Sequence, residues 1–213
     1  MSTNTTFFIG ILGAGLFVIS SIIGGILIDD YSITAQFISE TFAIDAQYGV
    51  PLRLFAIIPS GVLFTLFAYG AYMNLPQSNM TKLGFIGWGL FYGVATAVVG
   101  IFPCDSGCNR ELINPSLSQI IHNLIAAFTY MIVPLCILLI AISLRKWPSF
   151  KRLANLGILC GTISYLFVML LFSDPNSEIV GLYQRVIEGL FIVWMLGCAF
   201  RIKKGRSATN EWQ

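Results

Sequence analysis

Six long stretches of the chain carry almost no Asp, Glu, Lys or Arg. The stretches are residues 7–28, 54–75, 84–103, 117–144, 153–173 and 181–200. A helix needs about 20 apolar residues to cross about 30 Å of hydrocarbon, and each stretch is long enough. The stretches lack the apolar–polar alternation of β-barrel strands. The pattern therefore predicts an all-α fold, an integral membrane bundle of six transmembrane helices in a single domain of residues 1–213.

The composition supports this interpretation. Hydrophobic residues make up 56% of the chain and charged residues 10%, against roughly 25% charged residues in soluble domains. The opening MSTNTTFF carries no positive charge, and Asp29 and Asp30 follow the first stretch. This start favours a membrane helix over a cleaved signal peptide. No phosphate-binding or dinucleotide motif is present, and we expect no cofactor. For a membrane protein we expect membrane lipids as partners and no nucleic acid.

Basic residues lie in alternate gaps between the stretches. Nine of the twelve are Lys82, Arg145, Lys146, Lys151, Arg152, Arg201, Lys203, Lys204 and Arg206. Positively charged loops stay in the cytoplasm, so we expect a multi-pass cell-membrane protein with both termini cytoplasmic. The outer side then receives nine of the ten acidic residues. An acidic outer side also follows by default when basic residues are held inside.

The stretch FPCDSGCNRELINPSLSQIIHN, residues 102–123, concentrates chemistry near the outer face. Asp, Ser and Gly between its two cysteines favour a tight turn, in a compartment where disulfides persist. A disulfide between Cys104 and Cys108 is therefore our leading interpretation. A redox pair and a metal site are the alternatives, and the metal site would draw on Cys104, Cys108, His122 and Asp105. The CxxxC spacing and the single histidine speak against both, so no metal is expected.

A layer of polar side chains is expected in the outer third of the membrane. His122 lies about one and a half turns into the fourth stretch, and Arg185 and Glu188 are three apart at the start of the sixth. Ionisable residues at this depth are costly and face protein or a water-filled cavity. They predict either a structural Arg185–Glu188 ion pair or an outward-facing polar pocket. The candidate pocket residues are Arg185, Glu188, His122, Arg53 and Asp105, with Asn123 and Gln184 at the same level.

Two further features bear on how the helices are arranged. Gly89, Gly93 and Ala97 form a row at helical spacing, and small residues in such rows let membrane helices approach closely. We expect the row to pack inside the monomer, with a dimer face as the alternative. The connection of residues 29–53 mixes aromatic and acidic residues and is expected to hold a short helix at the membrane interface.

The segments FPCDSGC, IHN and GLYQRVIEG together resemble an uncharacterised six-span family, domain of unknown function 998. The resemblance covers nearly the full length. It lies in the span count and in the order of an outer Pro-Cys-Asp-x-x-Cys turn, a His near the start of span four and an Arg near the start of span six. The resemblance implies the six-helix architecture and assigns no activity.

The function we expect is binding of a lipid head group or a small anionic group in the outer pocket. An Arg guanidinium binds a phosphate or carboxylate through two parallel hydrogen bonds. One alternative is a lipid-modifying enzyme with His122 as acid or base, oriented by Glu188 or Asp105. Another is a structural or partner-binding protein with no ligand. A transporter would need a polar path inward, and the inner halves of the stretches show almost no polar residues.

Overall fold

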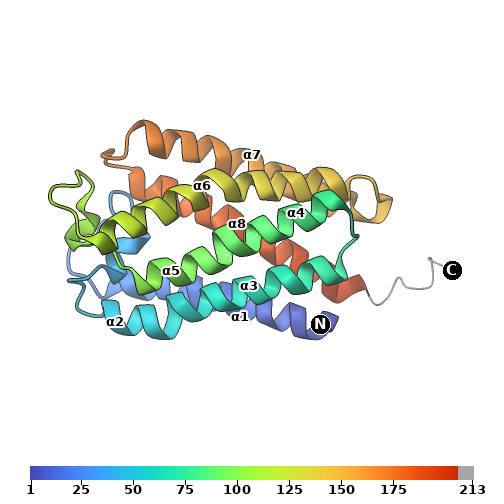
Figure 1. Cartoon of the computed structure of the whole chain (residues 1–213), viewed down its shortest axis with the longest axis horizontal. Coiled ribbons are helices and arrows are strands. Elements are labelled where there is room, and N and C mark those ends of the chain that lie inside the picture. The colour runs from blue at the N-terminus through green and yellow to red at the C-terminus, as the bar shows by residue number, and fades with distance from the viewer. Residues whose placement is uncertain (206–213) are drawn as a thin grey trace.

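The computed structural model describes residues 1–205 and shows a bundle of long helices lying side by side, with no β-strand in this range (Figure 1). The elements that make up the six helical stretches are α1 (Thr3–Ile26), α2 and α3 (Gly49–Leu52, Ile58–Asn74), α4 and α5 (Asn79–Trp88, Ala95–Ile101), α6 (Leu117–Leu144), α7 (Lys151–Ser173) and α8 (Val180–Lys204). The all-α fold class is thereby confirmed. Arg206 and the acidic Glu211 lie outside the described residues.

Five of the six stretches are long and apolar enough to cross a membrane. The remaining one is α8, which carries Arg185 and Glu188 near one end and three basic residues in its last turn. α8 packs against both α1 and α7, and its Phe191 and Met195 are fully buried. Its crossing of the membrane stays a prediction.

The second and third stretches each contain a π-helical segment. Arg53–Ile57 (η2) joins α2 to α3, and Gly89–Val94 (η3) joins α4 to α5. A π-helical turn carries an extra residue and re-aims the side chains around it. In η3 this places Tyr92 in the core with 1% of its surface exposed.

The row of small residues in η3 and α5 faces α3. A Cβ atom added at Gly93 would lie 2.6 Å from the backbone nitrogen of Thr65, and one added at Gly61 would lie 2.7 Å from the carbonyl oxygen of Gly93. Real Cβ atoms do not approach so closely, so only glycine fits at this crossing. The expectation that the row packs inside the monomer is confirmed.

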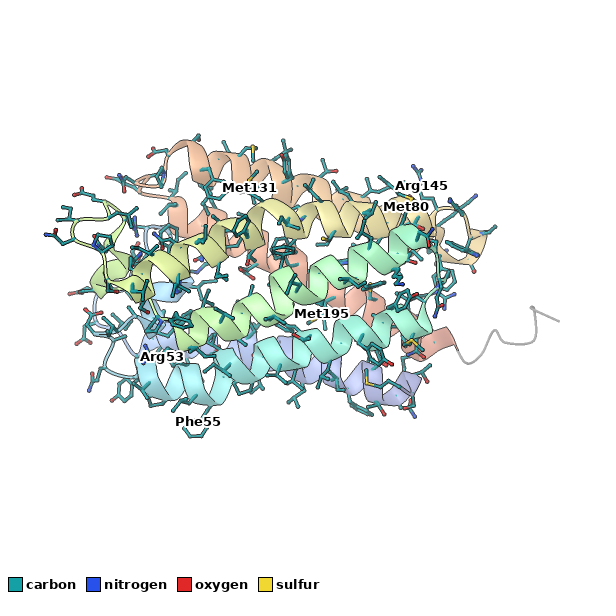
Figure 2. The ribbon with its side chains drawn as sticks, in the orientation of Figure 1. Arg53, Phe55, Met80, Met131, Arg145 and Met195 are labelled. Carbon is teal, nitrogen blue, oxygen red and sulfur yellow. A yellow bond between two sulfur atoms is a disulfide. The ribbon has the colours of Figure 1, made fainter. Side chains whose placement is uncertain are left out.

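The chain begins and α8 ends at the same end of the bundle (Figure 1). Lys203 Nζ donates a hydrogen bond of 2.8 Å to Asn4 Oδ1 there. Arg53 and Arg145 lie at opposite ends, and Phe55 points away from the helices (Figure 2). The expected separation of the two groups of loops is therefore present. Which group faces the cytoplasm stays a prediction.

The connection between α1 and α2 contains a short helix, as expected, and its position at the membrane interface stays a prediction. Its 3₁₀ helix η1 (Ile38–Phe42) covers the end of the bundle, and Phe42 and Ala43 are buried with 4% and 1% of their surface exposed. The backbone N–H of Ile38 donates a 2.6 Å bond to Gln184 Oε1 of α8. The connection folds inward because a buried partner on α8 satisfies its backbone.

Candidate functional site

The two cysteines of the loop between α5 and α6, Cys104 and Cys108, form a disulfide, with Cα atoms 4.8 Å apart. The disulfide expected from the sequence is therefore present. Because the two sulfurs are bonded to each other, neither is a thiolate that would bind a metal ion. The Cys104 carbonyl also accepts a 2.9 Å bond from the Ile44 N–H, which ties this loop to the connection that carries η1.

An ion pair closes the same end of the bundle. Arg110 Nη2 lies 2.6 Å from Glu40 Oε1, and within residues 1–205 this is the only salt bridge. Arg110 also donates to the carbonyl of Ala35 at 2.8 Å. Glu40 further accepts bonds from the Phe37 N–H and from Gln36 Nε2. Both charged groups are thus hydrogen-bonded within the two loops, residues 27–48 and 102–116. We call these two loops together the cap.

Asp105 fixes the start of α6. Its carboxylate accepts bonds from the backbone N–H and the hydroxyl of Ser116, which is the N-cap residue of that helix. These hydrogen bonds lower the pKa of Asp105. Its own N–H donates to Gln119 Oε1 at 2.6 Å. Asp105 is therefore placed to hold the loop against α6.

A hydrogen-bonded network lies deeper, around Glu188. Its two carboxylate oxygens accept bonds from the hydroxyls of Tyr92 (3.0 Å) and Tyr130 (3.1 Å). Gln184 Nε2 donates to the Tyr130 oxygen at 2.7 Å, and Gln184 Oε1 accepts from Ile38. At 1.5 Å per residue Glu188 lies about 12 Å inside the start of α8. The network joins η3, α6, α8 and the cap.

Arg185 does not pair with Glu188, so the expected ion pair is absent. The two side chains diverge, because Glu188 turns toward the tyrosines of the core while Arg185 turns toward the cap. Its Nη1 donates to the carbonyls of Gln36 (2.8 Å) and Gly181 (3.0 Å), and its Nη2 to the Tyr31 hydroxyl (2.6 Å). Burial raises the pKa of Tyr31, which keeps that hydroxyl neutral.

His122 is buried with 5% of its surface exposed. Its Nδ1 lies 2.9 Å from the carbonyl oxygen of Phe102. A carbonyl only accepts, so Nδ1 carries the hydrogen and Nε2 is the free nitrogen. Neither Asp105 nor Glu188 hydrogen-bonds the ring. The arrangement expected for an enzyme, with His122 oriented by the carboxylate of Asp105 or Glu188, is therefore absent.

Two cavities meet at Glu188. The first, of about 320 Å³, lies between η1, α5, α6 and α8 and includes His122 and Asn123 in its lining. We call it the α6 cavity. The second, of about 510 Å³, runs between α1 and α8 and includes Tyr31 and Arg185. We call it the α1–α8 cleft.

The five candidate residues are thus divided. Arg185 and Glu188 share the α1–α8 cleft, and His122 and Glu188 share the α6 cavity. Arg53 and Asp105 line neither, and Arg53 only donates a 3.3 Å bond to the carbonyl of Phe42. Residue spacing places a side chain at a depth along its helix, but it does not show which cavity the side chain reaches.

The two tyrosines that bind Glu188 were missed by the sequence analysis. Both stand in apolar stretches, with Tyr92 in η3 and Tyr130 in α6. A buried tyrosine hydroxyl usually has a hydrogen-bond partner. Tyrosines deep in spans beside an isolated Glu188 were therefore a usable signal for this network.

The bundle of apolar helices and its buried polar network define a multi-pass helical membrane protein. A family model matches residues 11–201, and the family is described as "Protein of unknown function (DUF998)". The match covers most of the chain, so the chain belongs to this family, as its motifs suggested. Comparisons with curated proteins and with solved structures gave no match.

Proposed function

We propose that the protein binds the anionic head group of a membrane lipid in the α1–α8 cleft, through Arg185. The observation that carries the proposal is a guanidinium without an ion-pair partner at the edge of an apolar cleft. Among residues 1–205 the only salt bridge joins Arg110 and Glu40. Arg185 is therefore a cation held in place by neutral groups alone.

The hydrogen bonds of Arg185 leave room for an anion. A guanidinium has five N–H donors, and three of them are used on Gln36, Gly181 and Tyr31. The remaining two suit a phosphate, which accepts parallel bonds from one guanidinium. The three protein partners hold the guanidinium still, so a ligand would meet a preorganised donor pair.

The walls of the cleft suit the rest of a lipid. Along α1 they include Ile22 and Ile26, which are 57% and 76% exposed. Exposed aliphatic side chains on a membrane helix face acyl chains. A lipid bound with its phosphate at Arg185 would keep its chains against α1 and in continuity with the bilayer.

Glu188 lies about one turn deeper than Arg185 on α8, and it lines the same cleft. A carboxylate beside an anion would repel it. Both oxygens of Glu188 are bound by tyrosine hydroxyls, which draw the side chain toward the core. We propose that Glu188 shapes the floor of the cleft and that Arg185 holds the anion.

The cleft opens toward the outer leaflet in this proposal. The end of the bundle opposite Arg185 carries five basic residues in its loops and in the first turns of α4 and α7: Lys82, Arg145, Lys146, Lys151 and Arg152. Positive loops mark the cytoplasmic side, which supports both termini inside and the cap outside. α8 then completes six spans in the cell membrane, with Arg185 and Glu188 hydrogen-bonded to groups of the protein.

The test is lipid retention by the purified protein. Wild-type, Arg185→Met and Arg185→Lys proteins are placed in bilayer discs of phosphatidylglycerol and phosphatidylcholine, and the lipid that stays bound is identified by native mass spectrometry. Arg53→Met is the matched control, because Arg53 stands at the same end of the bundle and lines neither cavity (Figure 2).

We expect wild type to retain phosphatidylglycerol, and Arg185→Met to retain at least about tenfold less, since charge-assisted hydrogen bonds contribute about 1.5–3 kcal/mol. Arg185→Lys should retain an intermediate amount of phosphatidylglycerol, because lysine keeps the positive charge and lacks the paired N–H donors of a guanidinium. Inorganic phosphate that displaces the lipid completely would assign the site to a free anion. Equal retention by wild type and Arg185→Met would refute both forms of the proposal.

A further inference from the structure

We infer that the α6 cavity is a second binding site, for an uncharged apolar molecule that carries a hydroxyl group. The inference goes beyond head-group binding at Arg185, and it rests on different residues. The cavity lies on the other side of Glu188 and contains neither Arg185 nor Tyr31.

The charges that line the α6 cavity are already satisfied. Arg110 is paired with Glu40 at 2.6 Å. Glu188 accepts from Tyr92 and Tyr130. A charged ligand would have to break one of these interactions in a buried site, at considerable cost. The electrostatics of the cavity therefore favour an uncharged ligand.

Within residues 1–205, two polar atoms of the cavity lining make no hydrogen bond to the protein: Nε2 of His122 and Nδ2 of Asn123. Nδ1 of His122 donates to Phe102, which leaves Nε2 as an acceptor in the neutral ring. The ring of His122 lines the cavity. The Asn123 side-chain oxygen accepts from Gln119, which leaves its amide Nδ2 as a donor.

One acceptor and one donor on successive residues of α6 match a hydroxyl group, which both donates and accepts. The other hydroxyls of the lining are engaged, since Thr96 and Thr129 donate to their own helices. Apolar side chains such as Phe42, Ile57 and Ala127 form much of the wall. The match is therefore to a single polar group on an apolar body, as in a long-chain alcohol or an alkylphenol.

The size and the rim of the cavity fit a molecule that arrives from the bilayer. Its volume of about 320 Å³ is at the lower end for ligand pockets and holds a ring or one end of a chain. Phe172 and Pro175, at the outer end of α7, belong to the lining and are exposed. A chain can pass this rim with its hydroxyl inside and its tail in lipid.

The experiment uses a C12 alcohol that carries a diazirine, photolysed with the full-length protein in lipid discs. Labelled residues are located by mass spectrometry. Dodecanol, 4-octylphenol, dodecyl methyl ether and dodecane serve as competitors. We expect labels on cavity residues, competition by the two hydroxyl compounds, and at least about tenfold weaker competition by the ether and the alkane, because a buried unmatched donor and acceptor cost about 1–3 kcal/mol.

Two substitutions at His122 separate a binding role from a structural one. His122→Asn keeps a donor near the position of Nδ1 for the Phe102 carbonyl and removes Nε2. His122→Gln keeps a donor or acceptor near Nε2 and loses the bond to Phe102. We expect His122→Asn to keep the thermal midpoint and to need about five- to tenfold more dodecanol for the same competition. His122→Gln should lower the midpoint and keep more of the competition.

Ala127→Phe offers an independent check, because it fills the cavity and leaves His122 unchanged. It should abolish the specific labels. Leu124→Phe is the matched control on the lipid-facing side of α6, where Leu124 is 54% exposed, and it should not. Labels confined to lipid-facing residues, equal competition by dodecane, or unchanged competition in His122→Asn would each overturn the inference.

Discussion

The two halves of the bundle are filled in different ways. In the half near the termini, a Cβ atom added at Gly157 would lie 2.7 Å from both Ala141 and the Trp194 ring. In the half near the cap, Glu188 lines both cavities and is hydrogen-bonded to Tyr130, which lines the α6 cavity. The same helices, α6 and α8, contribute to both halves. The difference shows that close packing holds one end together while a hydrogen-bonded network and open space occupy the other.

This contrast places the candidate function at one end. In the half near the termini, the hydroxyls of Ser78 and Ser143 lie 2.7 Å apart, and Ser78 is the N-cap residue of α4. This polar contact pairs two groups of the protein with each other. Near the cap, Arg185 and His122 keep unused hydrogen-bonding groups. A protein that needed only stability would have little reason to leave such groups open beside a cavity.

The largest expected effect tests which end faces outward. A cysteine placed at Ser149, between α6 and α7, should stay unlabelled by a membrane-impermeant maleimide in intact cells, because basic loops stay cytoplasmic. One placed at Asn176, between α7 and α8, should react. The native free cysteines Cys136, Cys160 and Cys198 are buried. The reverse labelling pattern would put the cleft in the cytoplasmic leaflet.

The next effect tests how tightly the helices pack at their closest crossing. Gly93→Leu should lower the free energy of unfolding by about 3 kcal/mol, since overpacking forces backbone shifts. Gly15→Leu is the matched control, because a Cβ atom at Gly15 meets nothing within 4 Å. Thermal unfolding in detergent would measure both. Equal midpoints for the two variants would contradict the close contact of η3 with α3.

A smaller loss is expected at the network. Glu188→Leu should cost about 2 kcal/mol of unfolding free energy, because it leaves the Tyr92 and Tyr130 hydroxyls buried without an acceptor. Glu188→Gln should cost less, since the amide oxygen still accepts. Adding Tyr92→Phe to Glu188→Leu should restore part of the loss. If the double variant is less stable than Glu188→Leu alone, the hydrogen bond to Tyr92 is not the cause.

The smallest effect concerns Asp105 and pH. Hydrogen bonds from Ser116 lower its pKa in the folded state, so Asp105 contributes stability above its unfolded pKa of about 3.9. That contribution is lost as the pH falls through the lower folded pKa. Thermal midpoints of wild type should therefore drop more steeply below about pH 4 than those of Asp105→Asn. If the midpoints of wild type and Asp105→Asn change with pH in parallel, the carboxylate of Asp105 does not contribute this pH-dependent stability.

The sequence predicted the helices well because a membrane span is a local signal. Its length and its lack of charge are both visible in a window of about 20 residues. α8 shows the limit of that signal. Residues 181–200 were expected to form a span, but α8 carries Arg185, Glu188 and a basic last turn and is not among the helices apolar enough to cross a membrane. The disulfide was predictable for the same local reason, since one turn contains both cysteines.

The site was only partly predictable, because its contacts join residues far apart in the chain. Arg185 and Glu188 are neighbours on one helix face by spacing, yet each finds partners on other elements: Gln36 and Tyr31 for Arg185, Tyr92 and Tyr130 for Glu188. The π-helical turn that aims Tyr92 inward and the inward fold of η1 have no reliable mark in the sequence. Depth along a helix was predictable, and the direction of each side chain was not.

The most direct test of the central claim is an experimental structure of the full chain in lipid discs that contain phosphatidylglycerol. The account predicts a head-group phosphate within hydrogen-bond distance of the Arg185 guanidinium, with acyl chains along Ile22 and Ile26 of α1. Glu188 should remain bound to its two tyrosines. An Arg185 side chain paired with a carboxylate of the protein, beside a cleft with no lipid phosphate in it, would contradict the account.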